Sequence, residues 1–255
     1  MRRNLNMKNR DFLSLFPVKK PIIAMLHLKG ETPEETFERF RKELEEYIQG
    51  GVDAVIIETY FGTCSEMVQA LEYTQQQHIG IPYGVNCLNV DAMGFHLAKE
   101  YGASFVQLDS VVGHVKPRDE DSEQMFLDWM RSEYEGCVLG GVRFKYQPML
   151  SVHSVEEDLQ TAMGRCDAIC VTEDRTGQET SVSKIKEFRN GIGSFPLVVA
   201  AGVTPDNASK SLRIADAAIV GSYFKDTYHD DGEVSPEHIR TFMDSILEIR
   251  KEEEK

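Results

Sequence analysis

The chain has 255 residues, of which 41% are hydrophobic and 27% are charged, and its formal net charge at pH 7 is −14. This length is enough to bury a sizeable core, as one large domain or two smaller ones. An acidic surface repels phosphate backbones, so we expect no nucleic-acid partner, although a locally positive pocket can still hold a small anion. No apolar run approaches the length of a membrane span, which predicts a chain without one.

The five cysteines are odd in number and their spacings match no zinc ribbon. This pattern favours free thiols and a cytoplasmic location. The basic segment 1–20 has only a short, interrupted apolar part and no small-residue cleavage site, so we reject a signal peptide. We expect an N-terminal extension over 1–20 that covers one end of the core with Phe12 and Phe16, followed by one domain over 21–255.

Eight apolar runs follow one another along the chain. They begin near Pro21, Ala54, Tyr83, Phe105, Lys145, Ala168, Pro196 and Ala217. Most are almost continuously apolar, which is typical of strands that are covered on both faces. The run at Lys145, "KYQPML", is taken as the fifth strand.

Amphipathic segments with helix-start signals lie between these runs. Capping boxes at 32–35 and 154–157 and the pair Ser235-Pro236 each predict the beginning of a helix. Eight strand–helix units in about 250 residues predict a closed (β/α)8 barrel. The competing fold is an open, doubly wound sheet, which usually carries a glycine-rich turn after its first strand, whereas "HLKGETPEE" has one glycine.

Two neighbouring strands near the C-terminus, "VVAAGVTPDN" and "AAIVGSYFK", both end at a glycine. In such barrels a phosphate often binds between the loops after strands seven and eight, at a helix N-terminus. Glycines let the backbone approach an anion closely, and N–H groups there can donate to it. The predicted phosphate-binding residues are Gly202, Val203, Thr204, Gly221, Ser222 and Lys225. The alternative is that the glycines only permit tight turns and that Lys225 is an exposed lysine.

Several fragments resemble the BtpA/SgcQ family within the ribulose-phosphate-binding class of barrels. The fragments are "PIIAMLHLKG", "GVDAVIIE", "IPYGVNCLNVDA", "GASFVQLDSVVG", "RTG", "VVAAGVTPDN" and "AAIVGSYFKD", and they extend over nearly the whole chain. The resemblance implies a barrel with a phosphate site. It also implies an association with photosystem I assembly in cyanobacteria and with sugar-utilisation gene clusters in other bacteria, without a settled reaction.

Polar residues stand at the predicted strand ends, which converge at one mouth in a barrel. Glu58 and Asp109 are the expected acid and base, because a carboxylate after an apolar run is costly unless it has a partner or a function. His27 is an acid, a phosphate donor or a hydrogen-bonded rim residue. Each carboxylate can instead cap a nearby N–H group, or the pair can hold a divalent cation. Expected substrate-binding residues are Asn86, Gln147, Glu173, Arg175 and Thr176.

These residues favour an enzyme that binds a small phosphorylated, sugar-derived metabolite and acts as an isomerase, epimerase or lyase by acid/base chemistry. No lysine lies near the mouth within a strand except Lys145, at a strand start, which speaks against a Schiff-base aldolase. The alternative is a non-catalytic assembly or regulatory factor that uses the barrel as a scaffold. The sequence leaves open a homo-oligomer.

Overall fold

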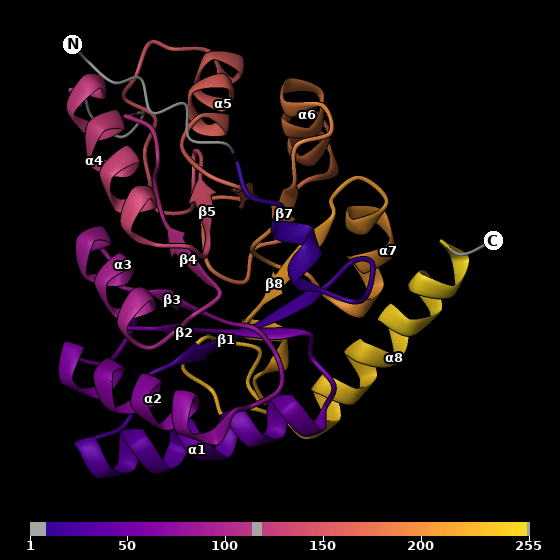
Figure 1. The fold of residues 1–255 in the computed structure, drawn as a ribbon. Helices are drawn as coiled ribbons and strands as arrows, with labels where there is room; N and C mark the ends of the chain where they lie inside the picture. Colours follow the sequence, from indigo (N-terminus) through magenta and orange to yellow (C-terminus); the bar gives the residue numbers. More distant parts are fainter. Residues whose placement is uncertain (1–8, 114–118, 254–255) are drawn as a thin grey trace.

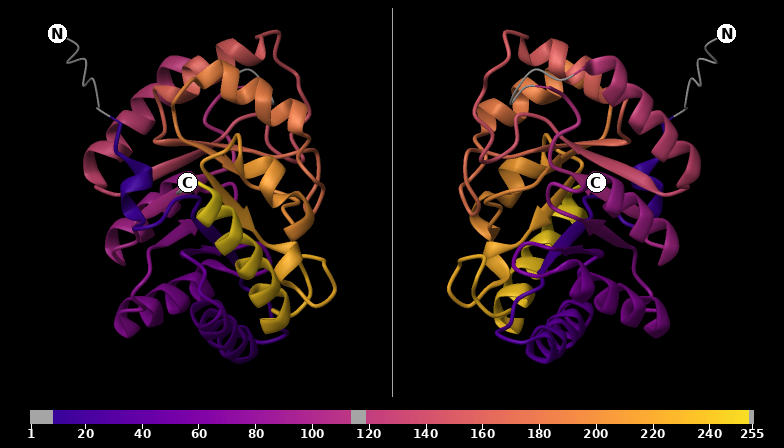
Figure 2. Two further views of the ribbon diagram at one scale, coloured as in Figure 1. Left: turned by 90° about the vertical axis from the view of Figure 1, so that its right-hand side faces the viewer. Right: turned by 90° about the vertical axis from the view of Figure 1, so that its left-hand side faces the viewer.

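Eight parallel strands pair with one another in chain order, and β8 pairs with β1 to close the barrel. The structure is a computed structural model that describes residues 9–113 and 119–253. Helices surround the strands on the outside, as Figures 1 and 2 show. The predicted closed (β/α)8 barrel is therefore confirmed.

The strands are β1 (Ile22–His27), β2 (Ala54–Glu58), β3 (Tyr83–Asn86), β4 (Phe105–Leu108), β5 (Cys137–Gly141), β6 (Ala168–Val171), β7 (Leu197–Val199) and β8 (Ala217–Val220). The α-helices are α1 (Pro33–Gln49), α2 (Cys64–Gln77), α3 (Asp91–Glu100), α4 (Glu120–Glu133), α5 (Val155–Met163), α6 (Val182–Ile192), α7 (Pro205–Leu212) and α8 (Pro236–Glu252). Two short 3-10 helices are η1 (Phe12–Leu15) and η2 (Ser222–Phe224).

The three predicted helix starts are confirmed. The hydroxyls of Thr32, Ser154 and Ser235 each accept a hydrogen bond from the backbone N–H group three residues later. Such caps satisfy donors that have no partner inside the helix, and each contributes about 1 kcal/mol. In the part of the chain that the structure describes, no helix is long and apolar enough to cross a membrane.

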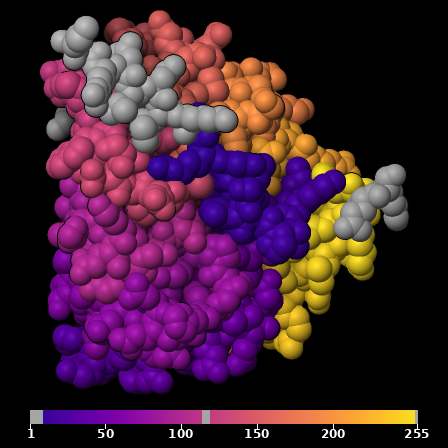
Figure 3. Space-filling view, in the orientation of Figure 1, coloured from indigo at the N-terminus to yellow at the C-terminus, as the bar shows by residue number. Residues whose placement is uncertain are grey.

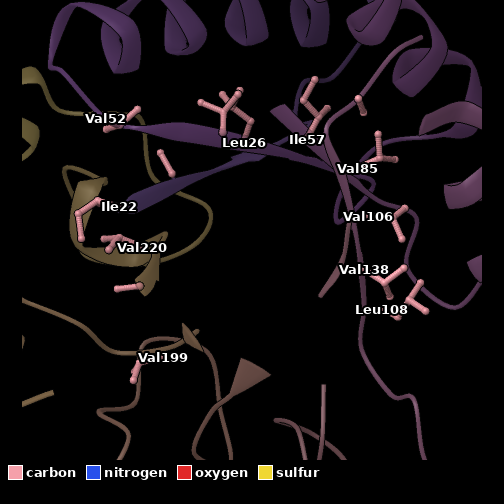
Figure 4. Packing of buried hydrophobic residues seen from close by; sticks show 14 of the residues in the cluster. Ile22, Leu26, Val52, Ile57, Val85, Val106, Leu108, Val138, Val199 and Val220 are labelled. Atoms are coloured by element: carbon pink, nitrogen blue, oxygen red, sulfur yellow. The ribbon is translucent and has the colours of Figure 1, made fainter. Parts of the chain in front are cut away.

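The direction of each strand side chain follows from strict alternation. In β1, Ile22, Ala24 and Leu26 pack outward with the helices, whereas Ile23 and Met25 pack into the lumen of the barrel. Figure 4 shows members of the outer layer on successive strands. Because both faces are buried, the strands read as continuous apolar runs rather than as alternating ones. The same alternation aims the residue that ends β1 into the lumen, at the mouth.

The N-terminal extension closes the opposite end of the barrel. Phe12 is fully buried, packs with the lumen residues, and its ring centroid lies 6.1 Å from that of Phe105. Arg10 donates to the carbonyl oxygens of Gly136 and Tyr134, which fastens the segment to the barrel. Figure 3 shows the indigo extension lying across this face of the molecule. The expected covering role of Phe12 and Phe16 is confirmed.

The fifth strand differs from the prediction. It is Cys137–Gly141, and the run at Lys145 lies in the irregular loop that follows it. The adjacent glycines Gly140 and Gly141 weaken the apolar pattern of this strand in the sequence. Both are required because neighbouring residues pack closely against them. A Cβ atom on Gly140 would lie 2.8 Å from Val111, and one on Gly141 would overlap the Asp109 carbonyl.

Candidate functional site

A row of polar side chains ends the first four strands at the mouth of the barrel. In the strand register His27 lies beside Glu58, and Glu58 lies beside Asn86. Asp109 follows β4 directly and shares the lumen-facing side of that strand with Phe105. Alternation within adjacent strands therefore brings these residues to one level of the lumen, as the sequence predicted.

The four side chains form one continuous chain of contacts. His27 Nε2 lies 3.1 Å from Glu58 Oε2. The Asn86 amide nitrogen donates to Glu58 Oε1 at 3.1 Å and to Asp109 Oδ1 at 3.2 Å. His27, Glu58 and Asn86 are buried, with exposed fractions of 7%, 4% and 2%. Buried polar groups in such numbers are costly unless they are paired, and here every link is made.

The contact between His27 and Glu58 requires a proton. His27 Nδ1 lies 3.0 Å from the backbone carbonyl oxygen of Asp230, which can only accept a hydrogen bond, so Nδ1 carries a hydrogen. In a neutral imidazole the other nitrogen would then be an acceptor, facing a carboxylate oxygen that is also an acceptor. A hydrogen bond between Nε2 and Glu58 Oε2 therefore needs one further proton, carried by either atom.

Asp109 has different electrostatics. Burial, with the nearby charge of Glu58 as the second cause, raises the pKa of Asp109 to about 6. The hydrogen bond from Asn86 acts in the opposite direction. A carboxylate with a pKa near the operating pH is suited to general base or acid catalysis. The Asn86 amide thus lies between two different groups: the His27–Glu58 pair on one side and Asp109, whose pKa is raised, on the other.

Loops from four different strands meet above this chain. Tyr60 follows β2, and its ring centroid lies 5.1 Å from that of His27. Burial, and then its hydrogen bond with Asp230, raises the pKa of Tyr60 to about 12. After β5 and β6, the Thr176 N–H group donates to the Tyr146 hydroxyl at 3.2 Å. Thr176, predicted from the sequence, therefore lies in a roof with Tyr60 and Tyr146.

The ends of β7 and β8 present free backbone donors. The N–H groups of Gly202, Val203, Gly221 and Ser222 have no hydrogen-bond acceptor among residues 9–113 and 119–253. A Cβ atom on Gly221 would meet only the Cβ atom of the lumen residue Met25, at 3.5 Å. The face of Gly221 is therefore open toward the barrel mouth.

Gly202 has a different reason to be glycine. Its φ is +65°, and an added Cβ atom would overlap the backbone of Gln178 and Glu179 in the loop after β6. The absence of a side chain makes room for protein backbone, so the tight-turn interpretation explains this position. Thr204 is the N-cap residue directly before α7, and its N–H group donates to Asn207 Oδ1 at 2.9 Å.

Other predicted residues lie at varied distances from the chain of contacts. Gln147 is in the loop after β5 rather than at a strand end, and it donates to the Asp109 carbonyl oxygen at 3.3 Å. The Glu173 carboxylate accepts from the Ser181 N–H group at the start of α6, as a capping carboxylate would. Arg175 is exposed in the same loop.

Lys225 lies away from the free backbone donors. Its ammonium group is 2.9 Å from Glu43 Oε2 on α1, and the residue is 1% exposed. An ammonium group buried in an ion pair is not available to an anion. The prediction that Lys225 binds phosphate therefore finds no support in its position, because the chain after β8 turns it outward to α1.

Three further residues lie near the mouth and are absent from the residues predicted from the sequence: Gln107, Tyr60 and Asp230. Gln107 is 3% exposed and faces the lumen on β4, one level below Asp109, and its side-chain oxygen accepts no hydrogen bond from the described residues. Gln107 could have been found in the sequence as the single polar residue within the apolar run before Asp109. Tyr60 and Asp230 are placed by loops, for which no periodicity exists.

The donor set at the two carboxylates does not fit a divalent cation. The amide nitrogen of Asn86 lies between Glu58 and Asp109 and donates to both, where a cation would need oxygen ligands. Across the described ranges, no group of three or more His, Cys, Asp and Glu residues is arranged to hold a metal.

Fold and site define a (β/α)8 barrel with titratable groups at the C-terminal ends of its strands. The model of the BtpA family matches residues 18–248, and the chain belongs to this family. An uncharacterized protein of Pyrococcus furiosus is 26% identical over 93% of this chain and 97% of its own length.

Two more relatives carry names that match the resemblance seen in the sequence. Photosystem I biogenesis protein BtpA of Synechocystis is 21% identical over 93% of this chain and 92% of its own length. Putative sgc region protein SgcQ of Escherichia coli is 22% identical, with 91% and 96% covered. The BtpA/SgcQ resemblance is therefore confirmed.

Solved structures share the fold at low identity. One described as "Native KDPGal structure" has a TM-score of 0.63 and 16% identity, and covers 91% of this chain and 96% of its own. Orotidine 5'-phosphate decarboxylase from Pyrococcus horikoshii has a TM-score of 0.61 and 15% identity, with 89% and 99% covered. At these identities the comparison establishes the barrel architecture alone.

Proposed function

We propose that this protein is an enzyme that binds a small phosphorylated, sugar-derived metabolite and transfers protons on it, as an isomerase, epimerase or lyase does. The observation that carries the proposal is the buried chain from His27 through Glu58 and Asn86 to Asp109. It holds two carboxyl groups on one rim in different electrostatic settings, and such a difference can separate acid and base roles at one pH.

In this proposal Asp109 is the base. With its pKa near 6, it is largely ionised at pH 7 and takes a proton from the carbon next to a substrate carbonyl. The electron pair of the broken C–H bond moves to the carbonyl oxygen as an enolate forms. The His27–Glu58 pair supplies its shared proton to that oxygen or to the neighbouring carbon. Asn86 keeps the two carboxyl groups at fixed positions by donating to both.

The proposed anion site lies at Gly221 and Ser222, with the N–H groups of Gly202 and Val203 and the start of α7 on its other side. Free N–H groups and the positive end of a helix dipole attract phosphate. The loop after β6 approaches this site at Gly177, since a Cβ atom added there would lie 3.4 Å from Ser222 Oγ, and Arg175 and Thr176 in the same loop are the side chains proposed to close over the ligand. Several barrels of similar fold carry phosphorylated compounds in their names, which supports this ligand class.

A panel of sugar phosphates, matched with the unphosphorylated sugars, tests the proposal by thermal shift. A ligand that binds only the folded form raises Tm, by an amount that grows with its concentration over its Kd. We expect phosphorylated members to raise Tm and their unphosphorylated partners to do so far less. Compounds that bind are then tested for exchange of carbon-bound hydrogen with deuterated water, with Asp109→Asn as the control. Absence of any response to phosphorylated ligands contradicts the proposal.

A scaffold role is the second candidate, because one relative is named for photosystem I biogenesis. The loop after β5 offers an apolar surface for a partner, with Leu150 62% and Val152 99% exposed. Replacing both residues with serine tests the scaffold role. The scaffold role expects the variant to lose a protein partner that wild type captures, whereas the enzyme proposal expects the variant to keep the partners and the ligand binding of wild type.

A further inference from the structure

The segment 226–233 between β8 and α8, here called the strap, reaches back over the mouth to His27. Figure 1 shows this part of the chain, in gold, next to α1. The residues that flank the strap, Lys225 and Val234, pair as an isolated antiparallel bridge. Within it, the Asp226 N–H group donates to the Glu233 carbonyl oxygen at 2.8 Å, and the Glu233 N–H group donates to Asp226 Oδ1 at 2.9 Å.

Cations of the first strand–helix unit fasten the strap from outside. Lys29 donates to the carbonyl oxygen of Asp231 at 2.7 Å. Arg39 donates to the carbonyl oxygen of Gly232 and also to Glu43 Oε1, at 3.0 Å in the second case. The strap is thus held through its backbone carbonyl groups, which leaves the Asp230 carbonyl aimed at the barrel mouth.

The base of the strap is a buried ion pair. Lys225 Nζ lies 2.9 Å from Glu43 Oε2, and the two side chains are 1% and 2% exposed. Glu43 also accepts from Arg39, so a single carboxylate joins the base of the strap to the residue that holds its far end. Removing one member of such a pair leaves an uncompensated buried charge, which makes the anchor sensitive to substitution.

We propose that Lys225, Glu43 and Arg39 are positioning residues that fix the proton of His27 through the strap. The Asp230 carbonyl accepts from Nδ1–H, and this contact directs the other imidazole nitrogen, with the shared proton, toward Glu58. The other groups around the ring are Tyr60, Phe61 and the Asp230 side chain that bonds to Tyr60. The Asp230 carbonyl is the acceptor that faces Nδ1, so it favours the form of the ring with a hydrogen on this nitrogen.

The inference rests on the proposed function only for the use of that proton, and the test needs no turnover. The ¹⁵N resonances of His27 are measured in the full-length protein with labelled histidine and are assigned by their loss in His27→Gln. We expect the wild-type Nδ1 resonance at the protonated position, with a proton protected from exchange with solvent. In Lys225→Met, which removes the ammonium group, we expect this resonance to shift and its proton to be lost to exchange.

Arg131→Met is the matched control. Arg131 is 1% exposed and pairs with Asp167 at 2.8 Å, next to the N-terminal extension that closes the opposite end of the barrel. We expect a comparable loss of Tm without a change at His27. An equal shift of the His27 resonance in Arg131→Met means general loosening of the barrel and overturns the proposal, as does an unchanged resonance in folded Lys225→Met.

If Lys225→Met does not fold, Arg39→Met tests whether the strap fixes the proton on His27. The Arg39 side chain is 18% exposed, so its removal leaves the barrel intact while the Gly232 carbonyl loses its donor. We expect the same loss of Nδ1 protection, restored in part by Arg39→Lys, which keeps a donor and a charge. A wild-type His27 signal in Arg39→Met overturns the role of the strap. The proposed function fails separately, through ligand binding and hydrogen exchange on the substrate.

Discussion

The two ends of this barrel are closed by opposite chemistry. At the N-terminal end, the rings of Phe12 and Phe16 pack edge to face, 5.4 Å apart, and seal the lumen with apolar surface. At the C-terminal end the same lumen is filled by polar side chains with hydrogen-bonded partners, under a roof of loops. An apolar seal needs only volume and shape, whereas a buried polar cluster needs every partner in place. We therefore expect changes at the N-terminal end to affect stability and changes at the C-terminal end to affect the proposed chemistry.

A substitution among the polar side chains at the C-terminal end should lower turnover more than it lowers stability. Glu58→Gln keeps the shape of the side chain but removes the carboxylate that shares a proton with His27. We expect turnover of the substrate found in the ligand screen to fall by about 10²–10⁴-fold, the usual contribution of general acid–base catalysis. Steady-state kinetics measure the effect, and circular dichroism checks the fold. Turnover within a few-fold of wild type removes Glu58 from the mechanism.

Breaking the apolar end should remove stability without chemistry. Phe12→Ala empties a fully buried position in the lumen and should lower the free energy of unfolding by about 3–5 kcal/mol. Denaturant titration measures this change. Val152→Ala is the control, because Val152 is 99% exposed and should leave the unfolding midpoint unchanged. If ligand affinity fell in Phe12→Ala as much as stability does, the two ends would not be independent.

Gly221→Val tests the anion site within the polar end. The new Cβ atom meets only Met25, so the fold should tolerate the branched side chain, which then occupies the space beside the free N–H groups. We expect phosphorylated ligands to bind about 10–100-fold more weakly, as for the loss of one or two charged hydrogen bonds. Calorimetric titration measures the affinity. Equal affinity would assign Gly221 to the turn alone.

A pH dependence of stability and of proton transfer should also distinguish the polar end from the apolar end. Because the folded pKa of Asp109 is about 6, above its ordinary value near 3.8, the folded state binds more protons between these values than the unfolded state does. Asp109 should therefore destabilise the fold as pH rises from 4 to 6, and Asp109→Asn should remove this trend. Proton transfer by wild type should increase over the same range. Urea titrations and exchange rates at several pH values test both, and parallel stability curves for the two proteins would contradict the assignment.

Most of the polar residues at the C-terminal end of the barrel can be predicted from the pattern of apolar and polar residues in the sequence. His27, Glu58, Asn86 and Asp109 each stand at or directly after the end of an apolar run, and alternation fixes them toward the lumen once the barrel is known. The fifth strand was misplaced because "CVLGG" carries too little side-chain signal to compete with "KYQPML". Its glycines are explained by close contacts with Val111 and Asp109, which are distant in sequence.

The sequence by itself determined the barrel, the helix starts, the covering extension and the strand-end rim, since each depends on periodicity or capping within a few residues. The tertiary structure alone decided which cation belongs to which anion. Lys225 looked like a phosphate ligand because it follows the last strand, but it pairs with Glu43, 182 residues earlier in the chain. The tertiary structure also shows that Gly202 makes room for the backbone of Gln178, and that the Asp230 carbonyl lies next to His27. Those outcomes depend on how loops from separate strands pack together, and loops have no periodicity from which their contacts can be predicted.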